Sequence, residues 1–198
     1  MQTETKGKNI RSVLTDLSSV FPEFELSHDL VGYNLLRTRE SSLVSIMDGK
    51  PESSEINFNA ISLNISGVLA GCASYAVMNN ANKAGARNLY ARIDLVITKV
   101  SFRGLGTSRL LILVLMAYLL EKFGPHLYSI SCLAAHPAIE HVLEKLGFSP
   151  EKSPDRNYTK EILDLSARDT GELFDWYRKE AENSLRLVKY HLRQQKNG

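Results

Sequence analysis

The chain has 198 residues, of which 43% are hydrophobic and 23% charged, and its formal net charge is +2. These values are typical of one globular domain with a hydrophobic core, and they exclude extended disorder and a fibrous architecture. The small net charge disfavours a nucleic-acid partner, because the basic residues are scattered except near the C-terminus.

Cys72 and Cys132 have neither a CxxC partner nor a nearby histidine at zinc-ligand spacing. The sequence therefore predicts no metal site and no disulfide framework. The N-terminus is polar, and the longest apolar run, Leu110 to Leu120, is shorter than the ~20 residues that span a bilayer. We therefore expect a cytoplasmic protein without a membrane segment, in which this apolar run is a buried helix.

Apolar residues recur at helical spacing over residues 8–20, which predicts an amphipathic helix. Residues 23–50 give no clear pattern. From residue 56 the apolar residues follow the two-residue period of strands. A Ser66-Gly67 turn is expected to join residues 56–65 and 68–77 into a hairpin.

A third long strand is expected over residues 89–100, after a loop rich in Asn, Lys, Ala and Gly. Strict alternation along this strand sorts its side chains into two sets. One face carries Asp94, Val96 and Thr98, and the other carries Ile93, Leu95 and Ile97.

The second half of the chain predicts alternating helices and strands. The pattern indicates a helix over 108–123, a strand over 127–133, a helix over 137–146 capped by Gly147, a polar loop over 149–157, a strand over 158–165 and a long helix over 167–196. The strand-loop-helix-strand-helix succession implies a crossover between two parallel neighbours in a mixed sheet.

The segment from Arg103 to Ser108 reads Arg-Gly-Leu-Gly-Thr-Ser and lies between a predicted strand and the apolar run. Its two glycines allow a sharp turn with outward N–H groups, and the following helix adds a partial positive charge. The spacing matches neither the nucleotide-hydrolase loop nor the dinucleotide-binding fingerprint. The sequence therefore predicts a phosphate site for another kind of ligand.

Two motifs in this order resemble the GNAT superfamily of acyl-CoA-dependent N-acyltransferases. The first, Val96 to Ser108, is similar to the family's [RQ]-x-x-G-x-[GA] pyrophosphate loop, with Ser108 at the final small position. The second, His136 to Phe148, is similar to the family's helix that ends in Lys-x-Gly-Phe. The Ser66-Gly67 hairpin also looks like the family's second hairpin, and the resemblance covers roughly residues 60–165.

The resemblance implies an α/β fold in which helices flank a strongly twisted mixed sheet over residues 1–165. Residues 166–198 are then a C-terminal helical extension that packs on the domain or forms a homodimer contact. The expected co-substrate is acetyl-CoA or another acyl-CoA, and the expected acceptor is an amine of a small molecule or peptide.

The resemblance also assigns roles to individual residues. Asp94 occupies the position of a general base, which an amine acceptor with a pKa of about 10.4 requires, although a strand carboxylate paired with Arg92 or Lys99 is the plain alternative. Backbone N–H groups of Val96, Ile97 and Thr98 on the third strand would stabilise the oxyanion, and Arg103 or Arg109 would meet the pyrophosphate beside the loop. The expected cofactor-binding residues are Val96, Ile97, Thr98, Arg103, Gly104, Leu105, Gly106, Thr107, Ser108, Arg109 and His136.

Two positions depart from the family's pattern. His136 replaces an asparagine that helps to hold the cofactor, so His136 is a candidate cofactor ligand, a candidate catalytic acid or a simple helix cap. Leu143 replaces the tyrosine that protonates the leaving thiolate, and a leucine cannot donate a proton. Tyr128 and Tyr158 are weaker candidates for that acid. A catalytically silent CoA-binding or protein-interaction module is therefore the alternative to an enzyme.

Overall fold

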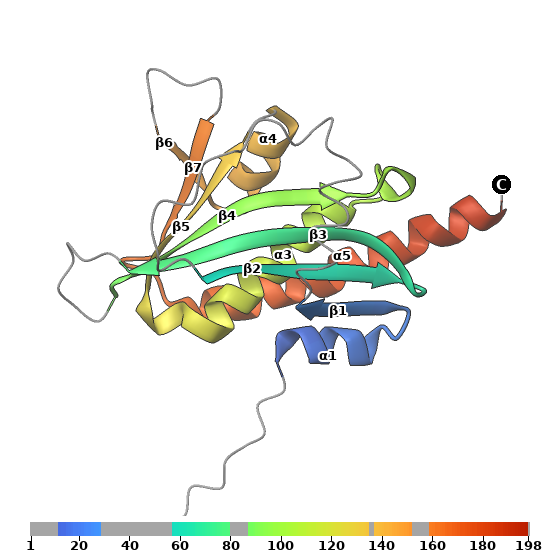
Figure 1. Cartoon of the computed structure of the whole chain (residues 1–198), viewed down its shortest axis with the longest axis horizontal. Helices are drawn as coiled ribbons and strands as arrows, with labels where there is room; N and C mark the ends of the chain where they lie inside the picture. Colours follow the sequence, from blue (N-terminus) through green and yellow to red (C-terminus); the bar gives the residue numbers. More distant parts are fainter. Residues whose placement is uncertain (1–11, 29–56, 80–86, 135–136, 152–158, 198) are drawn as a thin grey trace, which may run out of the picture.

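The computed structural model describes residues 12–28, 57–79, 87–134, 137–151 and 159–197 (Figure 1). Its centre is a seven-stranded sheet in the order β1-β2-β3-β4-β5-β7-β6, in which only β4 and β5 pair in parallel. The strands are β1 (Phe24–His28), β2 (Asn57–Ile65), β3 (Val68–Asn79), β4 (Leu89–Thr98), β5 (Leu127–Ala134), β6 (Ser149–Glu151) and β7 (Thr159–Asp164). The predicted mixed α/β sheet is confirmed.

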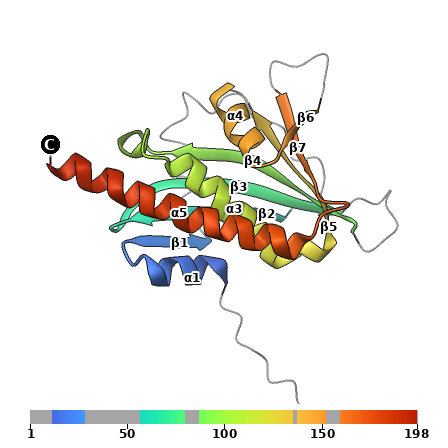
Figure 2. The ribbon, with the colours of Figure 1, turned by 180° about the vertical axis from the view of Figure 1, so that it is seen from behind.

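The helices that flank this sheet are α1 (Val13–Val20), α3 (Thr107–Phe123), α4 (Pro137–Lys145) and α5 (Thr170–Asn197). Two short 3-10 turns, η2 (Val100–Phe102) and η3 (Gly124–His126), precede and follow α3. Figure 2 shows α3 lying between the sheet and the long C-terminal helix α5, so the predicted additional C-terminal helix is present and contacts α3. Within the described residues no helix combines the length and the apolarity needed to cross a membrane.

The hairpin of β2 and β3 forms as predicted, with antiparallel pairing on both sides of Ser66 and Gly67. Both turn residues have positive φ, 51° for Ser66 and 76° for Gly67. Two consecutive positive φ angles are the requirement of a tight two-residue turn that follows the right-handed twist of the strands.

Helix α3 is buried on all sides, from Leu110 to Leu120. The sheet covers one side of this helix and α5 covers another, so an all-apolar sequence is stable in water only because both layers are present. The sequence-based expectation of a buried rather than a membrane helix is confirmed.

The end of α4 confirms the predicted glycine cap. Gly147 has a φ of 86°, its N–H donates to Glu144 O at 2.9 Å, and the Phe148 N–H donates to Leu143 O at 3.1 Å. This pair of hydrogen bonds satisfies the last carbonyl groups of the helix. Phe148 is consequently folded back into the core, where it is 3% exposed.

Several boundaries differ from expectation. The strand predicted over 89–100 ends at Thr98, because the chain then winds into η2. Strand β1 falls in the unassigned region after residue 23, and residues 149–151, predicted as a loop, form the short edge strand β6. Pro150 is tolerated in β6 because an edge strand needs fewer N–H donors. Residues 8–11 of the first predicted helix and residues 152–158 lie outside the described residues.

Candidate functional site

Strands β4 and β5 begin side by side and then separate. Their parallel pairing runs from Leu89 with Leu127 to Ile93 with Cys132 and stops there. Beyond Cys132, strand β5 continues to Ala134 in pairing with β7, and β4 continues to Thr98 in pairing with β3. The two ribbons diverge visibly in Figure 1. One edge of β4 is therefore open over its last residues.

The direction of the N–H groups along this open edge follows from the hydrogen bond of Lys99. Its N–H donates to Ala70 O on β3 at 2.9 Å, and alternate residues of an antiparallel strand point to the same neighbour. Ile97 therefore points its N–H toward β3. Val96 and Thr98 point theirs away from β3, into the separation of β4 and β5. Of the three predicted oxyanion donors, these two have the orientation that a ligand at the open edge requires.

The glycine loop follows η2 directly and adopts the conformation that its two glycines permit. Gly104 and Gly106 have φ angles of 78° and 86°, and both are exposed. The buried Leu105 side chain, 5% exposed, and a 3.1 Å hydrogen bond from Thr107 Oγ1 to Phe102 O fix the loop to the domain. Left-handed backbone at both positions turns the chain sharply into α3.

The N–H groups of this loop have no acceptor within the described chain. No backbone carbonyl there accepts a hydrogen bond from the residues between Gly104 and Ser108, and the first bond of α3 is that from Leu110 to Gly106 O at 3.0 Å. Unpaired N–H groups at the start of a 17-residue helix carry the positive end of its dipole. This arrangement can bind a phosphate.

The two arginines beside the loop lie in different surroundings. Arg103 Nε donates to Thr98 O at 3.2 Å, which holds its guanidinium at the open end of β4. Arg109 Nη2 pairs with Glu180 of α5 at 3.1 Å. Arg103 is therefore the arginine that the geometry favours as a phosphate contact, whereas the structure directs Arg109 toward the C-terminal helix.

Asp94 lies at an irregularity in β4 that the alternation of the sequence does not reveal. The pairing of β3 with β4 shifts between Ser74 and Tyr75, and Asp94 is the additional residue on β4. Ile93 and Val96 consequently pack in the core under α3, while Leu95 and Ile97 pack with Cys72 on the opposite face. The predicted face shared by Asp94, Val96 and Thr98 is therefore wrong.

The surroundings of Asp94 are those of a partly buried base. Its Oδ1 pairs with Arg92 Nε rather than with Lys99, on the face of the sheet away from α3, and its Oδ2 is buried without a hydrogen-bond partner among the described residues. Burial raises the pKa of the Asp94 carboxyl above its ordinary value, and the Arg92 guanidinium offsets part of that rise. A carboxylate with a raised pKa is a stronger base.

Two further polar groups near this point were not predicted. Ser74, directly opposite Leu95 on β3, is fully buried, and its Oγ has no partner among the described residues. Glu161 on β7 lies opposite Cys132 and is 3% exposed. Its Oε2 has no hydrogen-bond partner among the residues that the structure describes. The only sequence signal for Glu161 is a carboxylate at an inward position of an alternating strand.

Burial raises the pKa of the Glu161 carboxyl, and the negative charges of Glu140 and Glu144 on α4 raise it further. Such a group favours its protonated form more than an exposed glutamate does. The buried Glu161 carboxyl, opposite Cys132 where the pairing of β4 and β5 ends, is a second ionisable group near this site.

The remaining predicted site residues contribute little to this description of the site. His136 and Tyr158 lie outside the described residues. Leu143, at the position where the family places a tyrosine, is fully buried in the core, and both cysteines are also buried. Among the described ranges, no group of three or more His, Cys, Asp or Glu side chains could hold a metal ion.

The sequence matches no protein-family profile and no curated protein at a significant level. The structure, in contrast, is similar to many solved proteins. A Klebsiella pneumoniae protein named for acyl-CoA N-acyltransferase activity superposes with a TM-score of 0.54 at 11% identity, over 72% of this chain and 97% of that one.

Two other solved structures give the same result. The GNAT domain of the S. lividans protein PAT has a TM-score of 0.51 at 14% identity, over 70% of this chain and 89% of that one. The Escherichia coli GNAT N-acetyltransferase YhbS, solved with CoA, has a TM-score of 0.50 at 13% identity, over 77% and 85%. The chain therefore has the fold of the GNAT N-acyltransferases, as its two motifs indicate.

Proposed function

We propose that this protein transfers an acyl group from an acyl-CoA, with acetyl-CoA as the first candidate, to an amine of a small molecule or peptide. One observation supports this most directly. The separation of β4 and β5 opens beside a glycine loop whose N–H groups have no acceptor in the described chain. An extended thioester with a diphosphate at one end matches that combination of an open strand edge and an anion site.

In this proposal the diphosphate of CoA binds the N–H groups from Gly104 to Ser108, with Arg103 as a charged contact. The pantetheine arm follows the open edge of β4. The thioester oxygen then accepts a hydrogen bond from Val96 or Thr98, whose N–H groups point into the separation. Loss of one such donor to an oxyanion typically costs ~3 kcal/mol of transition-state stabilisation.

The amine approaches from the face of the sheet away from α3, which is the face where Asp94 lies. Its ammonium form first gives a proton to Asp94 Oδ2, because only the neutral nitrogen has a free electron pair. The nitrogen forms a bond to the thioester carbon, and the carbonyl becomes a tetrahedral oxyanion. The nitrogen then loses its second proton to water, the oxyanion re-forms the carbonyl, and the carbon–sulfur bond breaks with its electron pair on the sulfur. The buried oxygens of Asp94 and Ser74 are the groups that would hold the acceptor.

The leaving thiolate takes up a proton last. Leu143 cannot supply it, and its complete burial removes that position from the chemistry. A thiol has a pKa of about 8.5, so a thiolate can leave without a strong acid and be protonated by water. His136 stays a candidate for this role and for holding the cofactor.

The buried Leu143 also favours one alternative, a module that binds acyl-CoA without turnover. Two measurements on the same preparation separate the alternatives. Calorimetry with acetyl-CoA measures binding, and release of free thiol from acetyl-CoA with a panel of polyamines, amino acids and lysine peptides measures transfer. Binding with amine-dependent thiol release supports the enzyme. Binding without release in any amine supports the silent module, and absence of binding contradicts both.

A further inference from the structure

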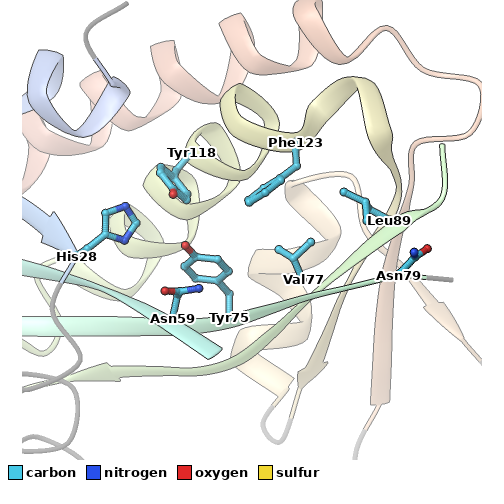
Figure 3. A pocket seen from close by; sticks show the side chains of 8 residues that line it. All are labelled: His28, Asn59, Tyr75, Val77, Asn79, Leu89, Tyr118 and Phe123. Atoms are coloured by element: carbon cyan, nitrogen blue, oxygen red, sulfur yellow. The ribbon is translucent and has the colours of Figure 1, made fainter. Parts of the chain in front are cut away.

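A cavity of about 480 Å³ opens between α3 and the first three strands, at the end of the sheet away from the glycine loop (Figure 3). It lies beside Phe123, the last residue of α3, and Leu89, the first residue of β4. The glycine loop precedes Thr107, the first residue of α3. Because a 17-residue helix is ~25 Å long, the cavity is separate from the proposed acyl-CoA site.

Aromatic rings form one wall of this cavity. His28 and Tyr118 meet edge to face with ring centroids 4.8 Å apart, and Tyr75 lies 5.9 Å from Tyr118. Figure 3 shows Tyr118 and Phe123 reaching in from α3, opposite Tyr75 and Val77 of β3. Rings that contact one another in this way form a continuous aromatic wall, against which a flat molecule can stack.

The polar groups in the wall are neutral. Burial raises the pKa of the Tyr75 hydroxyl, and its hydrogen bond with Tyr118 raises it further. Burial lowers the pKa of His28, and the charge of Lys122 acts in the same direction, although a hydrogen bond to the Ala60 carbonyl opposes both. The lining that the described residues supply contains no charged side chain. A charged ligand would lose part of its hydration here, and none of these lining residues would supply a counter-ion.

These neutral groups offer both kinds of hydrogen bond. A neutral imidazole that donates one N–H to Ala60 keeps its other ring nitrogen as an acceptor. Two tyrosine hydroxyls that share one hydrogen bond keep one donor and further acceptor capacity. A cavity of this size with aromatic walls and a few converging polar groups has the usual composition of a small-molecule site.

We propose that this cavity is a second ligand site, which binds an uncharged, planar aromatic molecule that carries a hydrogen-bond donor and an acceptor. The proposal does not depend on acyl transfer, because the cavity shares no residue with the glycine loop or with Asp94. The ligand stacks flat against this aromatic wall, and its polar group meets Tyr75, Tyr118 and His28.

The test is an NMR titration of the full chain with 4-hydroxybenzamide, which is planar, uncharged and able to donate and accept. Benzoate, which is charged, and cyclohexanecarboxamide, which is not planar, serve as matched probes. Saturable binding that is at least tenfold weaker for both matched probes supports the proposal. Absence of saturable binding, or equal binding of benzoate, overturns it. The titration is repeated with acetyl-CoA present, and displacement of the probe by acetyl-CoA also overturns the proposal.

Two variants locate the binding. Val77→Trp fills the cavity and abolishes binding, whereas Val68→Trp, at the exposed first residue of β3, leaves it unchanged. Tyr118→Phe keeps the ring, removes one hydroxyl, and weakens binding about fivefold, which is the usual loss for one hydrogen bond. If Val77→Trp does not fold, Tyr118→Phe decides alone. Unchanged affinity in Tyr118→Phe, or in a folded Val77→Trp, contradicts the proposal.

Discussion

Thr98 Oγ1 and Ser108 Oγ lie 2.7 Å apart and form a hydrogen bond that joins the last residue of β4 to the second residue of α3. The nine residues between them include η2 and the glycine loop from Gly104 to Gly106. This bond therefore fixes both ends of the segment whose N–H groups we propose as the diphosphate site. The geometry of the loop depends on side chains that need not touch the cofactor.

Thr98→Val removes this hydrogen bond at nearly constant side-chain volume. We expect a loss of about 1 kcal/mol in the free energy of unfolding, the usual net value of one hydrogen bond. We also expect acetyl-CoA to bind about fivefold more weakly, because the loop is less well fixed before binding. Chemical denaturation and calorimetry measure the two effects.

A matched control exists elsewhere in the sheet. Ser27 Oγ and Ser62 Oγ form a similar pair at 3.2 Å between β1 and β2. Ser27→Ala should cost a similar free energy of unfolding and leave the affinity for acetyl-CoA unchanged. Equal affinities in wild type and Thr98→Val would show that this bond does not position the loop.

Asp94→Asn should lower turnover at least ~100-fold, the lower range for loss of a general base, with little change in the KM for acetyl-CoA. The wild-type rate should fall as the pH drops through the pKa of Asp94, which burial raises, because the protonated carboxyl cannot accept a proton. Steady-state rates across pH measure this acidic limb. An Asp94→Asn variant that keeps the limb would remove Asp94 from the role of base.

Arg92→Gln should change the same pH profile in a different way, by shifting the acidic limb rather than removing it. The Arg92 guanidinium lowers the pKa of Asp94, so its removal should move the acidic limb to higher pH and leave the maximal rate within about threefold. Glu25→Gln, at an exposed position of β1, is the control and should shift nothing. A limb at the same pH in Arg92→Gln means that another group titrates.

Gly71→Ala should destabilise the fold by ~2 kcal/mol or more, the range for overpacking a tight site. A Cβ at this position would lie 2.6 Å from Ile97 O and 2.9 Å from Leu111 Cδ1, so β3, β4 and α3 would have to move. Gly67→Ala has open space around its Cβ and suffers only from its φ of 76°, which costs about 1 kcal/mol. Thermal unfolding that ranks the two variants in the reverse order would contradict this packing.

Glu161→Gln should stabilise the protein near neutral pH by about 1 kcal/mol, because the buried carboxylate has no hydrogen-bond partner for Oε2 among the described residues. Burial raises the folded-state pKa, so the folded protein binds more protons than the unfolded chain. Stability is then lost as pH rises from the unfolded value of ~4.3 through the raised folded one.

The difference in Tm between Glu161→Gln and wild type should therefore be near zero below pH 4 and grow toward pH 7. Glu25→Gln again supplies the exposed control, with no growth over that range. A difference that shrinks with rising pH would show that the Glu161 carboxylate is stabilised rather than strained by its surroundings.

The residues that the sequence reveals best are those with a strict local requirement. Gly67, Gly104 and Gly147 mark backbone with positive φ, and each lies at the turn or cap that its neighbours predict. The apolar run of α3 predicts a buried helix for a similar reason, because such a surface must be covered. These local rules identify most elements and the glycine loop.

The parts that could not be predicted depend on pairing between distant segments. The slip of register at Asp94 arises from how β3 meets β4, and it reverses the faces of every later residue on the strand. Glu161 becomes notable only because β7 carries it next to Cys132 and α4. The cavity near Phe123 gathers residues from five separate elements, and none of these residues belongs to a motif.

The proposed acyl transfer depends most on the binding of the CoA diphosphate by the N–H groups of the glycine loop. The direct measurement is a ¹H–¹⁵N NMR titration that follows the backbone amides of Gly104, Leu105 and Gly106 with CoA, and with pantetheine, which lacks the diphosphate. We predict large, saturable shifts of these amides with CoA and small ones with pantetheine. Amides that do not move while CoA binds elsewhere, or equal shifts with both compounds, would contradict the account.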